Sequence, residues 1–437
     1  MAYDMMVGRD DADREKYGKR GLVFLGKSYV TMGTTTSLAN NIFLDVNRSH
    51  VILVTGKRGS GKSTTLGVLA EEIINMPEDV KQNTAVLIFD TMGIFWTMKF
   101  PNARDEKLLR KWNMKPEAFD VDIYTPKGYY QEYKDKGIPT NYSFALKTSD
   151  LAAGDWVGIF EVKLTEPIGV LIEKTIASLH GQDFSISDII QTIKEENTDE
   201  HIKNAAINRF LAAESWGLFD EDGVTIDDLV KAGRTTIIDV SCYNNVSGSW
   251  GIKNLVIGYL CGKLINSRIT SRKVEEREAI ESEGNVFAKN TKQELPLTWV
   301  LLDEAHEALV KEGKTPATDA LVQLLREGRQ PGISLVLATQ QPGEIHKDVL
   351  TQTDIVISHK LTAKPDIEAL NTMMQSYLLS DIHKYLNDLP EAKGSAIILD
   401  DNSERIYPVQ VHPKKSWHGG STPSAIKLKE ELFKIDL

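Results

Sequence analysis

Short apolar runs that end on polar residues recur along the chain and predict buried β-strands. Downstream of residue 50 they lie at 51–54, 85–89, 235–240, 299–302, 333–338, 354–360 and 396–399. Segments with helical spacing of apolar residues separate most of these runs. Because such alternation is typical of parallel strands joined by crossover helices, we expect an α/β fold with a mostly parallel sheet and helices on both faces.

The first 50 residues have a different pattern. The first 18 are polar, and we expect this start of the chain to be flexible. The remainder predicts a small β module with strands at Gly21–Val30 and Leu38–Val46 and a turn or bulge at Asn40-Asn41. We therefore treat residues 1–50 as an N-terminal β module.

Residues 51–413 are predicted to form one core with two interruptions. The strand signal fades at 130–230, where helical periodicity predicts a helical insertion in the core. A charged and polar stretch at 271–296 predicts a helix end followed by an exposed loop. The rest, 414–437, is expected to be a C-terminal tail with an amphipathic helix over 424–437.

One apolar run leads directly into a glycine-rich loop. After Val54 and Thr55 the chain reads Gly56, Lys57, Arg58, Gly59, Ser60, Gly61, Lys62, Ser63, Thr64 and continues with helical spacing. In this strand–loop–helix setting, backbone N–H groups cradle a phosphate, Lys62 supplies a positive charge and the Ser63 hydroxyl can reach Mg²⁺. These residues predict a site for ATP and Mg²⁺ in a RecA-like P-loop NTPase core. The alternative is a degenerate loop that does not hydrolyse nucleotide.

A second stretch, Gly21–Ser28, satisfies the same pattern letter for letter. Its four intervening residues are all apolar, and the threonine-rich residues after it favour β structure over a helix start. We therefore interpret it as a buried strand, because the motif binds phosphate only between a strand and a helix.

Hydrolysis needs a second acidic strand, and the run at 299–302 ends on Asp303 and Glu304. Asp303 is predicted to hold Mg²⁺ through water and Glu304 to polarise the attacking water. The alternative is that both acids only cap the next helix. The run at 333–338 is followed by Gln340, whose amide is placed to sense a γ-phosphate or orient water, unless it belongs to an ordinary polar loop.

Two pairs of basic residues are further candidates. Arg326 and Arg329 lie between the runs at 299–302 and 333–338, and an arginine inserted into a neighbouring subunit's site would neutralise charge at the γ-phosphate. The alternative is an exposed helix end, where the dipole favours cations. Lys311 and Lys314 follow the acidic strand and are weak candidates for phosphate contacts, with a solvated loop favoured as the alternative.

Composition narrows the functional classes only slightly. The net charge of −11 argues against a surface coated in basic residues for DNA, but it does not exclude a few cations on channel loops. Two cysteines and scattered histidines predict neither a disulfide framework nor a zinc site. No apolar run approaches the ~18 residues of a membrane span, so we expect a cytoplasmic protein without a membrane partner.

In their order along the chain, these motifs resemble the HerA branch of the HerA/FtsK superfamily of ring-forming DNA-translocating ATPases. The matching pieces run from about Ile42 to Pro413. They are the stretch from Asp45 through Ser63, Leu87–Gly93, Ile237–Ser241, Leu302–His306 and Glu327–Arg329 leading into Thr339–Pro342. The chain lacks the arginine motif expected of the helicases that share the Asp-Glu-Ala-His box, which argues against membership of that superfamily. It also lacks the sequence Leu-Ser-Gly-Gly-Gln, which argues against a transporter-type ATPase.

The resemblance implies a hexameric ring with nucleotide at the subunit interfaces and double-stranded DNA in the central pore. It implies that Glu304 is the catalytic glutamate, Gln340 the sensor and Arg329 an arginine finger acting in trans. It also places Asp90 near the nucleotide. Archaeal relatives work beside the nuclease NurA in DNA-end resection, which makes a NurA-like nuclease a candidate partner.

Some features depart from that pattern and leave other functions open. The β module before the phosphate loop is short for the barrel of this family, and Lys360-Leu361 resembles the FtsK side. One alternative is a packaging, conjugation or antiviral-defence ATPase of the same superfamily. The other is a non-motor module in which ATP binding only closes a ring.

Overall fold

In a computed structural model, the described residues are 4–32, 35–246, 248–282, 295–374 and 382–420. They contain one large sheet in the order β1-β3-β2-β15-β14-β13-β4-β12-β11-β5-β10-β6-β7 and a small sheet of β8 and β9. The strands are β1 (Met5–Val7), β2 (Leu22–Met32), β3 (Thr35–Asp45), β4 (Val51–Thr55), β5 (Thr84–Asp90), β6 (Val121–Pro126), β7 (Tyr142–Phe144), β8 (Leu146–Lys147), β9 (Phe219–Asp220), β10 (Thr235–Asp239), β11 (Leu297–Leu302), β12 (Ile333–Thr339), β13 (Ile355–His359), β14 (Ser395–Asp400) and β15 (Arg405–Val411).

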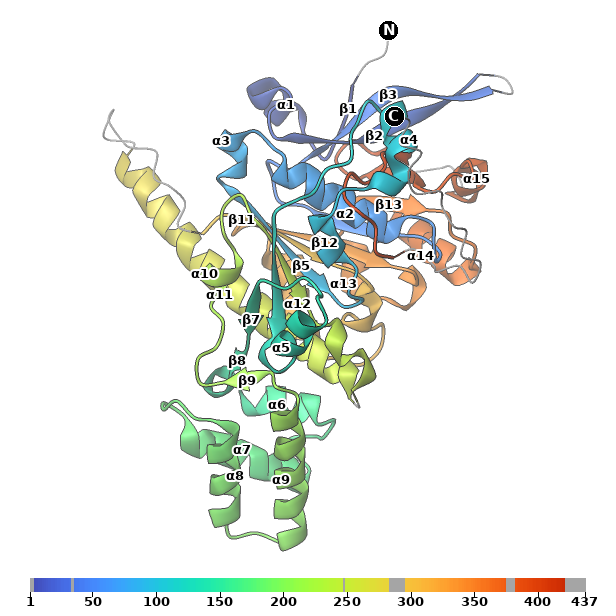
Figure 1. The fold of residues 1–437 in the computed structure, drawn as a ribbon. Coiled ribbons are helices and arrows are strands. Elements are labelled where there is room, and N and C mark those ends of the chain that lie inside the picture. The colour runs from blue at the N-terminus through green and yellow to red at the C-terminus, as the bar shows by residue number, and fades with distance from the viewer. Residues whose placement is uncertain (1–3, 33–34, 247, 283–294, 375–381, 421–437) are drawn as a thin grey trace, which may run out of the picture.

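Helices cover both faces of the central strands (Figure 1). Alternate side chains of one strand enter different cores: Leu53 packs on one face, and Ile52 and Val54 pack on the other. The helices are α1 (Asp11–Tyr17), α2 (Lys62–Ile74), α3 (Glu78–Lys81), α4 (Glu106–Lys111), α5 (Lys127–Asp135), α6 (Ala153–Ile159), α7 (Pro167–Leu179), α8 (Ile186–Glu195), α9 (Glu200–Ser215), α10 (Ile226–Leu229), α11 (Ser249–Ser282), α12 (Thr318–Glu327), α13 (Lys347–Gln352), α14 (Lys364–Met374) and α15 (Ile382–Asp388).

The predicted α/β fold with a mostly parallel sheet is confirmed. From β13 to β7 every neighbouring pair is parallel, whereas the pairs from β13 through β14, β15 and β2 to β3 are antiparallel. The phosphate-loop look-alike at 21–28 lies in β2, as expected. The pairing of β2 with β3 shifts register between Lys27 and Tyr29, which confirms the bulge near Asn40.

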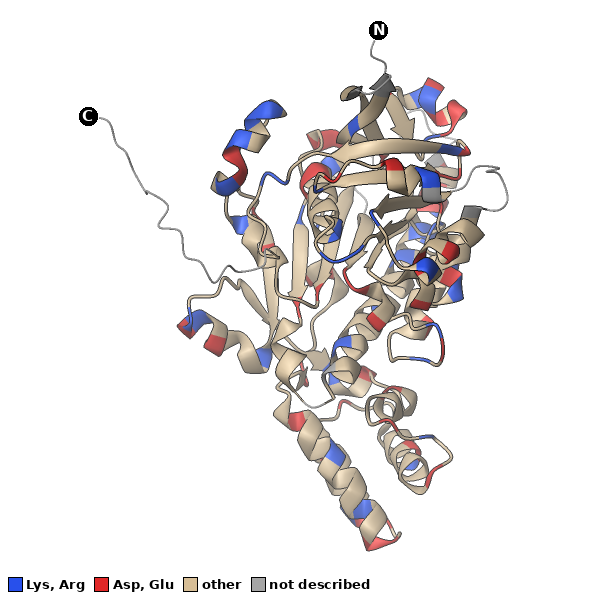
Figure 2. Ribbon diagram, turned by 90° about the vertical axis from the view of Figure 1, so that its right-hand side faces the viewer, with Lys and Arg blue, Asp and Glu red and all other residues tan. Residues whose placement is uncertain are grey.

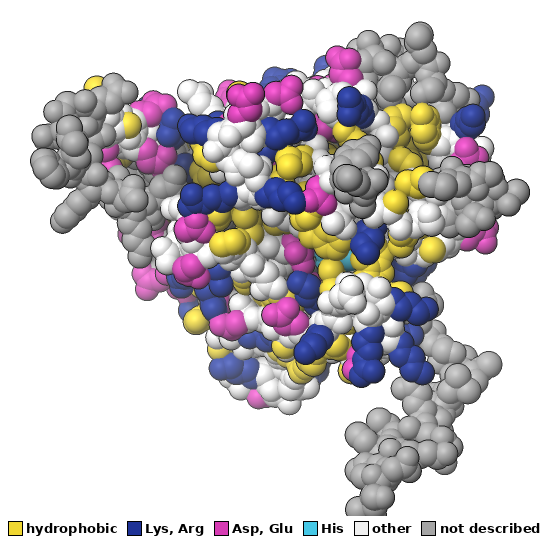
Figure 3. All heavy atoms as spheres, turned by 90° about the horizontal axis from the view of Figure 1, so that it is seen from above, with side chains coloured by type: hydrophobic (Ala, Val, Ile, Leu, Met, Phe, Trp, Pro, Cys, Tyr) yellow, Lys and Arg dark blue, Asp and Glu magenta, His cyan; other side chains and the backbone are white. Residues whose placement is uncertain are grey.

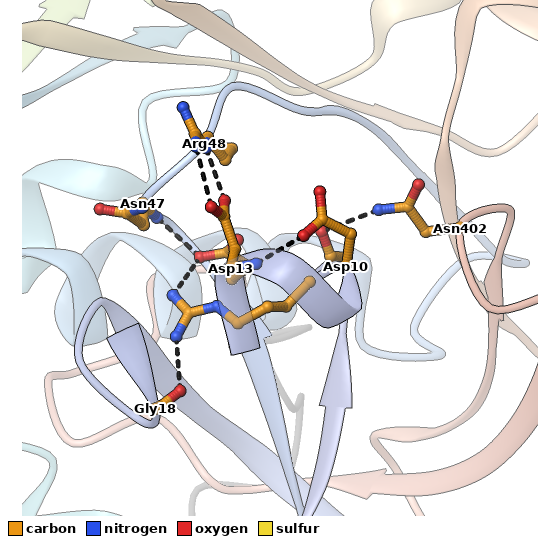
Figure 4. A network of polar contacts seen from close by, with 9 residues as sticks. Asp10, Asp13, Gly18, Asn47, Arg48 and Asn402 are labelled. Atoms are coloured by element: carbon orange, nitrogen blue, oxygen red, sulfur yellow. Dashed lines mark hydrogen bonds and ion pairs between the residues drawn. The ribbon is translucent and has the colours of Figure 1, made fainter. Parts of the chain in front are cut away.

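The prediction of a flexible start is wrong for residues 4–18, which form β1 and α1. Asp10 caps α1 by accepting a hydrogen bond from the backbone N–H of Asp13 at 2.7 Å. Arg9 donates to Asp45 at 2.7 Å, and neither side chain is exposed. Figure 4 shows the surrounding network, in which Asp13 faces Arg48. A three-residue strand and a seven-residue helix are too short for periodicity to detect, so tertiary contacts order this segment.

The region 130–230 is mainly helical, as predicted, although the short strands β7, β8 and β9 interrupt it. Helices α7, α8 and α9 project away from the large sheet (Figure 1), and Figure 2 shows acidic and basic residues interspersed along them. Helix α11 extends to Ser282, which lies within the stretch 271–296 for which a helix end was predicted. The loop beyond it and the helix predicted at 424–437 fall outside the described residues. None of the described helices has the length and apolar composition of a membrane span.

Replacement of Arg9 with alanine should lower the free energy of unfolding by about 3–5 kcal/mol, because Asp45 would remain buried without its counter-charge. Urea denaturation measures this change. Arg14→Ala is the control, since its ion pair with Asp11 is exposed and should contribute less than about 1 kcal/mol. Equal losses in both variants would contradict the role given to the buried pair.

Candidate functional site

The candidate residues at the carboxyl ends of three neighbouring strands come together. Strand β12 lies between β4 and β11, and all three are parallel with Thr339 opposite Thr55 and Leu337 opposite Leu302. The phosphate loop, the pair Asp303-Glu304 and Gln340 therefore leave the sheet at the same edge. This is the edge at which open α/β sheets bind ligands.

The phosphate loop is held against the end of β13. Gly56 has φ 152°, and a Cβ there would lie 2.4 Å from Ser60 Oγ and 2.7 Å from His359 Cβ. The backbone N–H of Lys57 donates to the carbonyl of Lys360 at 3.0 Å. Lys62 Nζ lies 3.4 Å from the carbonyl of Lys57, inside the loop. A side chain at position 56 would therefore change the path of the loop.

Ser63 donates a hydrogen bond from Oγ to Asp303 Oδ2 at 2.6 Å. This contact joins the first turn of α2 to the end of β11. Burial raises the pKa of Asp303, while the hydrogen bond from Ser63 opposes that shift. A hydroxyl and a carboxylate this close are the oxygen ligands that Mg²⁺ prefers, so the site fits a magnesium ion held by Ser63 directly and by Asp303 directly or through water.

Glu304 has an unusual backbone, with φ 51° and ψ 44° in the left-handed region. This turn directs its carboxylate to the end of the neighbouring strand, where Gln340 Nε2 donates to Oε1. The other oxygen, Oε2, is buried without a hydrogen-bond partner and lies 3.6 Å from His306 Nδ1. Burial and the charge of Asp303 raise the pKa of Glu304. The arrangement leaves one carboxylate oxygen free to act on a water molecule.

Lys62 faces the two acids from the loop. Burial lowers the pKa of its ammonium group, and the charges of Glu304 and Asp303 oppose this shift. The three predicted groups therefore lie within electrostatic reach of one another. A phosphate bound by the loop would replace the hydrogen bond from Lys62 to the Lys57 carbonyl with a charge-assisted contact.

Several supporting residues were not among the sequence candidates. His359 is buried, with one ring nitrogen 2.9 Å from Thr65 Oγ1 and the other 3.0 Å from the Ser395 carbonyl. Lys253 of α11 contacts Glu307 in the turn after Glu304, with 3.4 Å between Nζ and Oε2. The position of His359 at the end of an apolar strand could have indicated it from the sequence. The role of Lys253 depends on its contact with Glu307, 54 positions away in the sequence, which no local pattern predicts.

The carboxylate of Asp90 is hydrogen-bonded to the loop that follows it. Its carboxylate accepts hydrogen bonds from the backbone N–H groups of Gly93, Ile94 and Phe95 at 2.7–3.1 Å. In register with it on β10 lies Asp239, and burial together with the charge of Asp239 raises the pKa of Asp90 to about 7. These contacts assign Asp90 to ordering the segment after β5, and its place near the nucleotide stays a prediction.

The two arginines differ in their surroundings. Arg326 is 2.6 Å from Asp348 of α13, so it links two helices of its own chain. Arg329 is exposed and lines a cavity of about 430 Å³ with His50 and Leu297, which precede β4 and begin β11. Arg329 thus lies at the amino edge of the sheet, about 20 Å, a strand length, from the phosphate loop. Because Arg326 is paired within its own chain and Arg329 is exposed, this arrangement favours Arg329 as the arginine that acts in trans.

Lys311 and Lys314 are exposed but have partners in their own chain. Lys311 Nζ donates to the carbonyl of Gly343 at 2.9 Å, and Lys314 Nζ lies 2.8 Å from Asp319. These contacts favour the solvated-loop interpretation. A role in DNA binding would require both lysines to leave these partners.

The Asp90–Asp239 pair should make stability depend on pH. The pKa of Asp90 is about 7 in the folded chain and near 4 when unfolded, so folding takes up a proton between these values. The free energy of unfolding should therefore fall as pH rises from about 4 to 7. Urea denaturation across this range should give a smaller fall for Asp239→Asn, which removes the neighbouring charge. An unchanged slope would contradict the assignment.

Three comparisons place this geometry among known proteins. The family model described as "Helicase HerA, central domain" matches residues 30–263, more than half of the chain. A relative named "DNA double-strand break repair helicase HerA" from Sulfurisphaera tokodaii is 22% identical over 391 residues, covering 87% of this chain and 69% of the relative. The protein of the same name from Saccharolobus solfataricus is 21% identical over 390 residues, covering 88% and 66%.

Among solved structures, VirB4 of Thermoanaerobacter pseudethanolicus superposes with a TM-score of 0.53 at 14% identity. The match covers 89% of this chain and 96% of VirB4. It supports the fold, including the P-loop ATPase arrangement of the sheet. Together with the family model and the strand-end geometry, the comparisons lead to one conclusion: the chain belongs to the HerA helicase family within the HerA/FtsK superfamily.

Proposed function

We propose that this chain hydrolyses ATP in a hexameric ring and thereby moves along double-stranded DNA held in the pore. The observation that carries the proposal is the convergence of Lys62, the Ser63–Asp303 pair and the Glu304–Gln340 pair at one edge of the sheet. The relatives' names as DNA double-strand break repair helicases support the DNA substrate. Movement driven by ATP hydrolysis would use contacts with the backbone phosphates of the duplex and would therefore be indifferent to base sequence.

Each group of the site has a separate task in hydrolysis. Backbone N–H groups of the phosphate loop and the Lys62 ammonium group bind the β- and γ-phosphates. Ser63 and Asp303 would hold Mg²⁺, which neutralises phosphate charge when bound. Glu304 orients the attacking water through its free oxygen and accepts its proton, which its raised pKa favours. Gln340 fixes that carboxylate against the end of β12.

A neighbouring subunit would complete the site. Arg329 lies at the opposite edge of the sheet from its own phosphate loop, so it can reach only the nucleotide of another copy. Inserted there, its guanidinium would stabilise charge that develops on the γ-phosphate. This need for a second copy is the physical argument for a closed ring.

The family relationship supports a NurA-like nuclease as partner in DNA-end processing, which is part of this proposal. The alternative of a packaging, conjugation or antiviral ATPase shares the same hydrolytic site and differs in the DNA and the partner it serves. A non-motor assembly module would bind ATP without needing Glu304.

Replacement of Glu304 with glutamine tests the motor. The variant should bind ATP normally but hydrolyse it about 10²–10⁴-fold more slowly, because no base accepts the proton of water. Wild-type turnover should rise when duplex DNA is added, and the variant should not translocate. Glu312→Gln, which changes an exposed acid of a nearby loop, is the control. A variant that retains turnover, or a wild type indifferent to DNA, would favour the assembly module.

A mixing experiment tests the arginine in trans. Arg329→Ala and Lys62→Ala should each abolish turnover alone, yet mixed rings should recover part of it. Recovery is expected because an intact phosphate loop of the first variant can meet an intact arginine of the second. Native mass spectrometry should find six copies in each ring. Arg326→Ala, which breaks only the contact with Asp348, should keep turnover without mixing. Failure of mixed rings to recover would exclude action in trans.

A further inference from the structure

A cavity of about 910 Å³ lies beside the first turn of α2, where the phosphate loop ends. Thr64 and Thr65 form part of its wall, and Thr64 Oγ1 is buried without a hydrogen-bond partner. Another part of the wall is Gly394, whose N–H donates to the Ser60 carbonyl at 3.1 Å. The cavity therefore adjoins the residues that directly follow the phosphate loop.

The walls come from segments that are far apart in the sequence. Strands β2 and β3 contribute Lys27, Tyr29 and Leu38, and further walls come from residues 102–112, 390–394 and 410–418. Figure 3 shows the face that carries β2, β3 and α4, where apolar side chains gather between lysine and arginine side chains. The family model ends at residue 263, so the last two segments lie outside the matched central domain.

The cavity combines aromatic surfaces with positive charge. Trp112 and Trp417 line it, and Lys27 Nζ lies 5.5 Å from the centre of the Trp112 ring. Five basic residues line the cavity, whereas Asp105 is the one acidic residue among the lining residues. The basic residues are Lys27, Arg104, Lys111, Lys393 and Lys414. Such a surface suits a ligand with a flat ring at one end and phosphates at the other.

The pKa of His418, another residue that lines the cavity, reflects the same positive charge. Burial, together with the nearby charges of Lys393 and Lys414, lowers the pKa of its imidazole to about 4. His418 is therefore neutral at pH 7 and presents an acceptor nitrogen as well as a donor.

The segment 412–418 is fastened to the helix that follows the phosphate loop. The buried carboxylate of Glu71 in α2 accepts hydrogen bonds from the N–H groups of Lys415 and Ser416 at 2.8 and 3.0 Å, and from Ser416 Oγ at 2.6 Å. Lys414 Nζ donates to the Trp417 carbonyl at 3.2 Å. These contacts tie the segment that carries Trp417 to α2, the helix that follows the phosphate loop.

We infer that this cavity receives the nucleoside half of the nucleotide, with Trp112 and Trp417 as stacking surfaces for the base. The inference rests on the proposed function, since the phosphate loop must first bind the triphosphate. Thr64 Oγ1 would then gain the partner it lacks, from the α-phosphate or the ribose. The basic residues of the walls balance the charge of the phosphates.

A comparison of two ligands separates the two halves of the site. Wild-type protein should bind both ATP and inorganic tripolyphosphate in calorimetric titrations, and Lys62→Ala should lose both. Trp112→Ala and Trp417→Ala should weaken ATP binding at least about tenfold, because each removes a stacking surface. Both should leave tripolyphosphate binding unchanged. Trp250→Ala, which removes an exposed tryptophan outside the cavity, is the control and should change neither affinity.

The outcomes distinguish this inference from the function on which it rests. If wild type binds tripolyphosphate and both tryptophan variants bind ATP normally, the nucleoside lies elsewhere and only this inference fails. Equal weakening of both ligands would also overturn it, since the tryptophans would then act through the fold. If wild type binds neither ligand, the proposed function itself fails. Trp417 provides an independent variant because Trp112 also packs near Phe24, with ring centres 6.4 Å apart.

Discussion

The hydrogen bond between Ser63 and Asp303 is the contact on which the rest of the site depends. It joins the first turn of α2, the helix that follows β4, to the end of β11, and β12 lies between β4 and β11 in the sheet. The parallel register of β4, β12 and β11 is what places the two residues within 2.6 Å. A shift of one strand by two residues would move its end by about 7 Å and separate the hydroxyl from the carboxylate.

Burial of charge gives this edge of the sheet its chemical character. Lys62, Asp303 and Glu304 are all removed from water, which disfavours the charged form of each and shifts the pKa of the ammonium group down and of the carboxyls up. The attraction between Lys62 and the two acids opposes these shifts, whereas the charge of Asp303 adds to the rise in the pKa of Glu304. The site is therefore arranged to gain free energy from a phosphate and a cation, which would restore the interactions that solvent no longer supplies.

The groups proposed to act on the nucleotide lie at opposite edges of the sheet. The phosphate loop, both acids and Gln340 lie at the carboxyl ends of the strands, whereas Arg329 lies at the amino ends. In the proposed ring, each copy would therefore offer one edge to each neighbour. The C-terminal segment adds a third element, because Glu71 ties residues 412–418 to the helix after the phosphate loop.

Local patterns determined the buried strands, the phosphate loop and the acidic pair, because each depends on residues within about ten positions. The same patterns excluded Gly21–Ser28 as a second phosphate loop. Only the tertiary structure decided the rest, since contacts between distant residues override short patterns. Arg9 pairs with Asp45 and helps to order residues 4–18, Arg326 pairs with Asp348, and the carboxylate of Asp90 accepts hydrogen bonds from its own loop. The cavity beside Thr64 likewise exists only because segments nearly 400 residues apart pack around one helix.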